Sequence, residues 1–259
     1  SSVQPPLSVK DSRESYPLST PFLLARTHNL CNPFQSAYRS GHSTETVLLR
    51  VVNDLLTAMD EDKRSVLLLL DLSAAFDTID HQILLCRLET VFDIRCLALQ
   101  WFQSYLTDRN QYVTVGNTKS SPSPLLFGVP QGSVLGPVLF VLYTTPLSDI
   151  ISAHCVNHQL FADDTQLHNS NQPKNIQPLL CELTACTCDI KTWMNENQLK
   201  LNDDKTEAML FAISSLPASY SLPQSITIGN HEISFLDTVR NLGFFLDKYL
   251  LMETHVNKV

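Results

Sequence analysis

The chain of 259 residues is long enough for one or two domains and for a buried hydrophobic core. Hydrophobic residues make up 44% of it and charged residues 17%, which excludes a wholly disordered protein. Its net charge of −8 at pH 7 disfavours a nucleic-acid binder that acts through bulk positive charge, although a local basic channel remains compatible with it.

The sequence also indicates a cellular compartment. The uninterrupted apolar runs, such as residues 66–70, are far shorter than the ~20 residues of a membrane-spanning helix. The 7 cysteines are odd in number and scattered, and no N-terminal stretch resembles a signal peptide. We therefore expect a reduced, intracellular protein of the nucleus and cytoplasm that does not cross a membrane.

The first part of the chain predicts one irregular segment followed by regular elements. Residues 1–33 are rich in proline and serine and show no periodicity. A helix is predicted after Ser43, a good N-cap residue, because apolar side chains then recur on one helical face. Residues 66–70 predict a central strand covered on both faces. Two helices follow, one capped by Asp80 and one with an apolar stripe formed by Leu97, Trp101 and Tyr105.

The second part predicts further strands and helices that do not alternate regularly. Three of the 7 glycines, Gly128, Gly132 and Gly136, fall within nine residues, which indicates that something approaches the backbone closely there. The predicted elements are a strand at 112–115, a helix at 134–142, strands at 156–160 and 165–168, a helix at 176–193, a strand at 208–211, a Ser/Pro linker at 214–223 and a hairpin at 226–233. This order favours an α+β fold over a doubly wound parallel sheet.

Three acidic residues lie at predicted strand ends. Asp71 follows the apolar strand, and Asp163 and Asp164 lie between two short strands. Adjacent carboxylates repel each other, and a divalent cation would compensate for that repulsion. Oxygen ligands suit Mg²⁺ or Mn²⁺, and two such ions can assist phosphoryl transfer. The alternative is that Asp71 is a turn or cap residue and that the acidic pair forms a hairpin apex.

Three motifs resemble the reverse transcriptases of LINE-type (non-LTR) retrotransposons. They are LDLSAAFDTIDH at 70–81, GVPQGSVLGP at 128–137 and FADD at 161–164, in the order of that family. Further similar segments are FQSAYRSGHST at 34–44, LKLN at 199–202, KTE at 205–207 and LG at 242–243. The resemblance implies the palm of a right-hand polymerase, an antiparallel sheet packed on helices, and an RNA-directed DNA polymerase activity.

The resemblance also implies the roles of the acids. Asp71 and Asp163 would bind two Mg²⁺ or Mn²⁺ ions, with Asp164 as a supporting ligand and the carbonyl of Leu72 completing a coordination shell. Lys205 matches a lysine that approaches the departing pyrophosphate and protonates it. A solvated surface lysine is the alternative for Lys205.

Other residues would contact the substrates. Phe76 would be the steric gate that excludes a ribose 2′-hydroxyl, or else a core aromatic residue. Gln131 and Gly132 would lie against the incoming deoxynucleoside triphosphate, or else form a turn before a helix. Arg39 and Arg109 would contact phosphates of an RNA template and a DNA primer, or else form exposed ion pairs. The sequence gives no indication of the oligomeric state.

The resemblance divides the chain into 1–33 as an irregular segment, 34–64 as partial fingers, 65–213 as palm with inserted finger elements, 214–225 as a linker and 226–259 as the palm end and start of a thumb. We expect a thumb that is essentially absent and fingers that are incomplete. Two functions stay open, an RNA-directed DNA polymerase and a non-catalytic descendant that acts at most as a binding module. A nucleotide cyclase with a palm-like sheet is disfavoured, because residues 128–137 and Lys205 follow the polymerase pattern.

Overall fold

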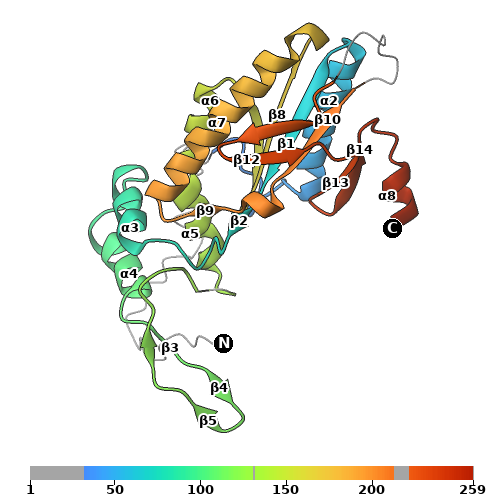
Figure 1. Cartoon of the computed structure of the whole chain (residues 1–259). Helices are drawn as coiled ribbons and strands as arrows, with labels where there is room; N and C mark the ends of the chain where they lie inside the picture. Colours follow the sequence, from blue (N-terminus) through green and yellow to red (C-terminus); the bar gives the residue numbers. More distant parts are fainter. Residues whose placement is uncertain (1–31, 131, 213–221, 259) are drawn as a thin grey trace. The chain divides into compact units, whose positions relative to one another are not determined.

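The computed structural model describes residues 32–130, 132–212 and 222–258 (Figure 1). The chain divides into two interleaved units. One contains Ala74–Thr145, and the other, which we call the sheet unit, contains Pro33–Ser73 and Pro146–Val259. The predicted segment 1–33 and linker 214–225 lie mostly outside the described residues, and residues 34–64 group with the sheet unit.

Four antiparallel strands form the main sheet. Their spatial order is β10-β1-β8-β7, with the bounds β1 Arg64–Leu70, β7 Asn157–Phe161, β8 Asp164–Asn171 and β10 Glu207–Phe211. The predicted strands at 66–70, 156–160, 165–168 and 208–211 are confirmed, within a few residues at their ends. The aliphatic strand β1 is central, which explains why it lacks the apolar/polar alternation of a half-exposed strand.

Helices cover both faces of this sheet (Figure 1). Helix α2, Thr44–Asp60, packs Val51 and Leu55 against Leu67 of β1 and against β10. Its N-cap is Ser43, as predicted, in a capping box with Thr46. Helix α6, Leu147–Ala153, contacts β7, and helix α7, Ile176–Glu196, contacts β8.

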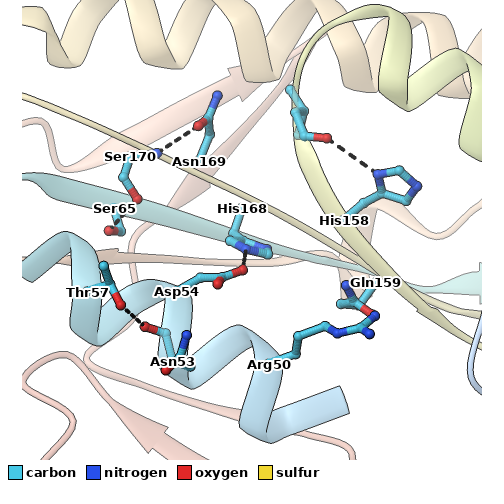
Figure 2. A network of polar contacts seen from close by, with 11 residues as sticks. Arg50, Asn53, Asp54, Thr57, Ser65, His158, Gln159, His168, Asn169 and Ser170 are labelled. Carbon is cyan, nitrogen blue, oxygen red and sulfur yellow. Dashed lines mark hydrogen bonds and ion pairs between the residues drawn. The ribbon is translucent and has the colours of Figure 1, made fainter. Parts of the chain in front are cut away.

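Two buried histidines mark the two faces. His168 on β8 contacts Asp54 of α2, with Nε2 3.0 Å from Oδ2 (Figure 2). His158 on β7 pairs in register with Leu167, the neighbour of His168, and bonds through Nε2 to Ser148 of α6 at 2.6 Å. His158 and His168 are each only 2% exposed. Burial lowers the pKa of both imidazoles.

The rest of the sheet unit consists of short elements. These are β2 Leu72–Ser73, η1 Pro173–Asn175, β9 Lys200–Leu201, η2 Asp203–Lys205, β11 Ser225–Ile228, β12 His231–Ser234, β13 Thr238–Asn241, β14 Phe244–Asp247 and α8 Glu253–Lys258. The hairpin predicted around Gly229 is confirmed as β11 and β12. The second hairpin, β13 with β14, was not predicted because its residues carry no clear alternation.

The described part of the other unit contains three helices and four two-residue strands with exposed side chains. Its elements are α3 His81–Thr90, α4 Cys96–Leu106, β3 Asn110–Gln111, β4 Thr114–Val115, β5 Thr118–Lys119, β6 Ser123–Pro124 and α5 Leu135–Thr144. Asp80 caps α3, as predicted, by accepting hydrogen bonds from the amides of Gln82 and Ile83. Of the predicted strand at 112–115, only β4 at Thr114–Val115 forms, and its side chains are exposed.

The helix predicted with the stripe Leu97, Trp101 and Tyr105 is confirmed as α4, but this stripe is not its buried face. Leu97 is 79% exposed and Trp101 is 47% exposed, whereas Phe102 and Leu106 are buried. Apolar side chains occur on more than one face of this helix, so their period alone does not identify the packed face.

One segment of the described chain, Leu135–Ala153, is long and apolar enough to span a bilayer by length and composition. It contains α5 and α6, which are separate helices with Pro146 before the second. Within this segment, 61% of the most apolar 18 residues are buried inside the protein. Buried helices in a protein core have the same length and composition.

Candidate functional site

The sheet register gathers three acids at one end of the main sheet. Leu70, the last residue of β1, pairs with Thr165 of β8. Asp71 therefore lies beside Asp164, which begins β8. Asp163 lies in the two-residue turn between β7 and β8, which Phe161 and Asp164 close as a pair. Asp71 and Asp164, 93 positions apart in sequence, are neighbours here because antiparallel pairing brings these strand ends together.

The acids interact electrostatically. Burial raises the pKa of Asp164 from its ordinary value of 3.8 to about 6, and the charges of Asp163 and Asp71 add to this increase. The side chain of Asp164 nevertheless keeps an exposed surface. In the absence of a cation, these carboxylates therefore destabilise one another at neutral pH.

Lys205 lies next to Asp71. Its Nζ atom is 3.1 Å from Oδ2 of Asp71, although the Lys205 side chain is 68% exposed. This is an ion-pair distance without hydrogen-bond alignment, and the buried Oδ2 accepts no hydrogen bond from any described residue. An ion pair with an exposed lysine contributes little to stability. The buried Asp71 oxygen therefore still lacks a partner that would offset the cost of its burial.

The loop that carries Lys205 is hydrogen-bonded to the chain at the end of β1. The amide of Asn202 donates to the carbonyl of Asp71 at 2.8 Å, and Leu72 of β2 pairs with Leu201 of β9. Lys191 of α7 donates to Oδ1 of Asp203 at 2.6 Å. These contacts hold η2, and thus Lys205, beside the acids.

Within the described ranges, no three or more His, Cys, Asp or Glu side chains are arranged as a preformed metal site. Asp163 and Asp71 are close enough to raise the pKa of Asp164, but the three acids do not form a complete metal site. A site that borrows ligands from substrate phosphates and water, as Mg²⁺ sites commonly do, needs no such cage. The ligand set of Asp71, Asp163 and Asp164 therefore stays a prediction.

Replacing Asp164 by asparagine should stabilise the metal-free protein at pH 7. A carboxyl with a raised pKa destabilises the folded state once pH exceeds its ordinary pKa, so this effect grows from about pH 4 to pH 6 and then levels off. Because the group is partly exposed, we expect about 1 kcal/mol, or about 2–4 °C in Tm. Thermal unfolding in EDTA tests this. An equal Tm difference between variant and wild type at pH 4 and pH 7 would contradict it.

Four of the sequence-predicted residues belong to the other unit. Phe76 packs against Phe140 of α5, with ring centroids 4.7 Å apart. Gly132 has φ +76 and open space where a Cβ would lie, and Gln131 is outside the described residues. Arg109 is buried and donates to the carbonyl of Tyr105 in the last turn of α4 at 3.1 Å. Arg109 is therefore not the exposed ion-pair residue that was the alternative to a phosphate contact.

The segment 34–44 lies in the sheet unit, and two of its residues, Gln35 and Tyr38, lie near the acids. Arg39 donates to the carbonyl of Pro33 at 3.4 Å. Burial and the charge of Asp163 raise the pKa of Tyr38, so this phenol lies near the acids. Gln35 bonds through its side chain to Ala162, the residue before Asp163. We assigned no role to Tyr38 or Gln35 from the sequence, where their only signal was membership of the quoted motif.

The family described as reverse transcriptase (RNA-dependent DNA polymerase) matches residues 20–244. The RNA-directed DNA polymerase from the mobile element jockey of Drosophila melanogaster is 29% identical over 234 residues. The probable RNA-directed DNA polymerase from transposon BS of the same species is 29% identical over 232 residues. These alignments cover 87% and 86% of this chain, but the chain spans only 24% of each relative.

Solved telomerase structures have a similar fold. The telomerase from Candida albicans in complex with a TWJ fragment of telomeric RNA has a TM-score of 0.54 at 15% identity, covering 88% of this chain and 38% of that one. The corresponding Candida tropicalis complex has a TM-score of 0.58 at 14% identity, covering 87% and 36%. The predicted α+β palm fold and the resemblance to reverse transcriptases are thereby confirmed.

Proposed function

Because the chain belongs to the reverse transcriptase (RNA-dependent DNA polymerase) family, we propose that it catalyses RNA-directed DNA synthesis. It would add deoxynucleotides to the 3′-hydroxyl of a DNA primer paired with an RNA template. The observation that carries this proposal is the meeting of Asp71, Asp163 and Asp164 at one sheet end, with Lys205 beside them.

The residues fit two divalent cations, Mg²⁺ or Mn²⁺. Oδ2 of Asp71 is buried without a hydrogen bond from the described residues, and Asp164 has a raised pKa because burial and nearby negative charge both disfavour its ionised form. A cation would relieve both unfavourable features. Asp71 and Asp163 would be its main ligands, with Asp164 and the carbonyl of Leu72 in support. When bound, the ions would stabilise charge on the attacking and leaving oxygens.

Lys205 would act on the leaving group, the pyrophosphate. Its ammonium is exposed and weakly paired, so it can leave Asp71 at small energetic cost. It would then donate a proton to the departing pyrophosphate. Arg39, whose guanidinium donates a long hydrogen bond of 3.4 Å to the carbonyl of Pro33, would contact a nucleic-acid phosphate.

Primer extension tests the proposal. A labelled oligo(dT) primer on poly(rA) should be lengthened by the chain when dTTP and Mg²⁺ or Mn²⁺ are present, and EDTA should stop the reaction. Binding of the primer–template without extension under either metal would contradict the proposal and favour the binding-module alternative. Absence of both binding and extension would contradict both functions.

Phe76 provides a test of sugar selection. As a steric gate, its ring would exclude the ribose 2′-hydroxyl, so Phe76→Ala should raise the ratio of kcat/KM for UTP over dTTP by about 10-fold or more. Phe127→Ala is the matched control, because Phe127 is an exposed phenylalanine of the same unit. An unchanged ratio in Phe76→Ala would show that the ring only packs against Phe140.

A further inference from the structure

The segment before α2 adds to the open edge of the main sheet. β7 is an edge strand, and Gln35 forms a parallel bridge with its residue Leu160. The amide of Leu160 donates to the carbonyl of Phe34, and the amide of Ser36 donates to the carbonyl of Leu160, both at 2.9 Å. Gln35 is therefore fixed beside the strand that leads into the acidic turn.

The side chain of Gln35 then bonds to the backbone of that turn. It is only 5% exposed. Its Oε1 accepts from the amide of Ala162 at 3.0 Å and from the amide of Ala37 at 2.9 Å. Its Nε2 donates to the carbonyl of Ala162 at 3.3 Å. One carboxamide thus satisfies both backbone groups of Ala162.

Ala162 needs such support because its backbone is strained. It has φ +56, in the left-handed region that disfavours every residue with a Cβ. Strained backbone persists only where the surroundings hold it. The dihedral angles of Ala162 set the direction in which the chain continues into Asp163, so relaxation at this residue would turn the Asp163 carboxylate away.

We propose that Gln35 is a positioning residue that holds Ala162 in the left-handed conformation and thereby aims Asp163 at the cation. The part of this inference that concerns the cation rests on the proposed function. The part that concerns the turn does not, and it is measurable in the metal-free protein. The competing explanation is that Gln35 only stabilises its own segment through Ala37.

Hydrogen exchange at the Ala162 amide separates these explanations. Gln35→Met has a similar length but no carbonyl acceptor, so we expect exchange at Ala162 to accelerate about 10-fold or more in the alanine-labelled protein. The matched control is Gln159→Met. Gln159 is 4% exposed, lies on β7 and contacts Arg50 of α2 rather than the turn (Figure 2). It should leave Ala162 exchange unchanged. Unchanged exchange in Gln35→Met would overturn the proposal.

Mn²⁺ binding without nucleic acid provides the second readout. Gln35→Met should raise the Kd for Mn²⁺ by about 10-fold, as expected when the support of a ligand is lost, and Gln159→Met should not. Ala162→Gly removes the Cβ penalty, so adding it to Gln35→Met should restore most of the affinity. Equal Mn²⁺ affinity in wild type and Gln35→Met would overturn the proposal. If the wild-type chain bound no Mn²⁺, the proposed function would fail, and exchange at Ala162 would still decide the role of Gln35.

Discussion

Asp71→Asn is expected to reduce kcat/KM for primer extension by about a thousandfold or more, because one charged cation ligand is lost where charge develops in the transition state. Oδ2 of Asp71 is a buried oxygen without a hydrogen bond from the described residues, and the variant can place a neutral amide there. The same change lowers the negative charge around Asp164, so the metal-free fold should not lose stability. Steady-state primer extension and thermal unfolding in EDTA provide the two measurements.

The matched control is Asp60→Asn. Asp60 is an exposed acid of the same unit, at the last residue of α2 and before β1 begins. Removing it changes the net charge by the same amount without touching the strand end. Activity should stay within about twofold, since an exposed charge away from specific partners has a small effect. If Asp71→Asn kept a tenth of the wild-type activity, Asp71 would not be an essential ligand.

Gly128→Ala is expected to destabilise the protein by about 2–4 kcal/mol. Gly128 has φ +84, and a Cβ there would lie 2.9 Å from the carbonyl oxygen of Asp77 and 3.0 Å from that of Phe76. Both contacts are with backbone, which cannot rotate away as a side chain would. The amide of Gly128 also donates to Ile79, and the amide of Val129 to Phe76, so the two segments are tied together. Urea unfolding measures the loss.

The variant Gly116→Ala separates the backbone strain of a positive φ from the steric overlap of an added Cβ with neighbouring atoms. Gly116 lies in the same unit and also has a positive φ, +60, but nothing lies within 4 Å of its added Cβ. Only the left-handed backbone penalty of about 1 kcal/mol should remain. If both variants lost the same stability, close backbone approach would not be what requires glycine at position 128.

Local patterns in the sequence predicted much of the sheet unit. Ser43 and Asp80 carry side chains that bond to the first free amides of a helix, so both helix starts were identified correctly. The aliphatic run before Asp71 predicted a central strand because nothing in it could face water. The acids at strand ends were likewise visible, because Asp71 follows the apolar run 66–70 and the pair Asp163 and Asp164 follows the apolar residues 160–162.

Other features were misjudged because several answers fitted the same pattern. Leu97 and Trp101 have helical spacing, but so do the buried Phe102 and Leu106, and only packing against α3 selects a face. The glycine cluster correctly indicated a close approach. At Gly128 and Gly136, however, the approaching atoms include the protein's own backbone, whereas Gly132 is open.

The sequence by itself determined the helix caps, the central strand, the acidic hairpin and, through its motifs, the family, since these depend on residues close together along the chain. Tertiary structure alone decided that Gln35 bonds to Ala162 across 127 positions and that Lys205 pairs with Asp71. A carboxamide or an ammonium can pair with any backbone group or carboxylate. Its partner is therefore chosen by the register of strands that pair across long stretches of chain, which no local period encodes.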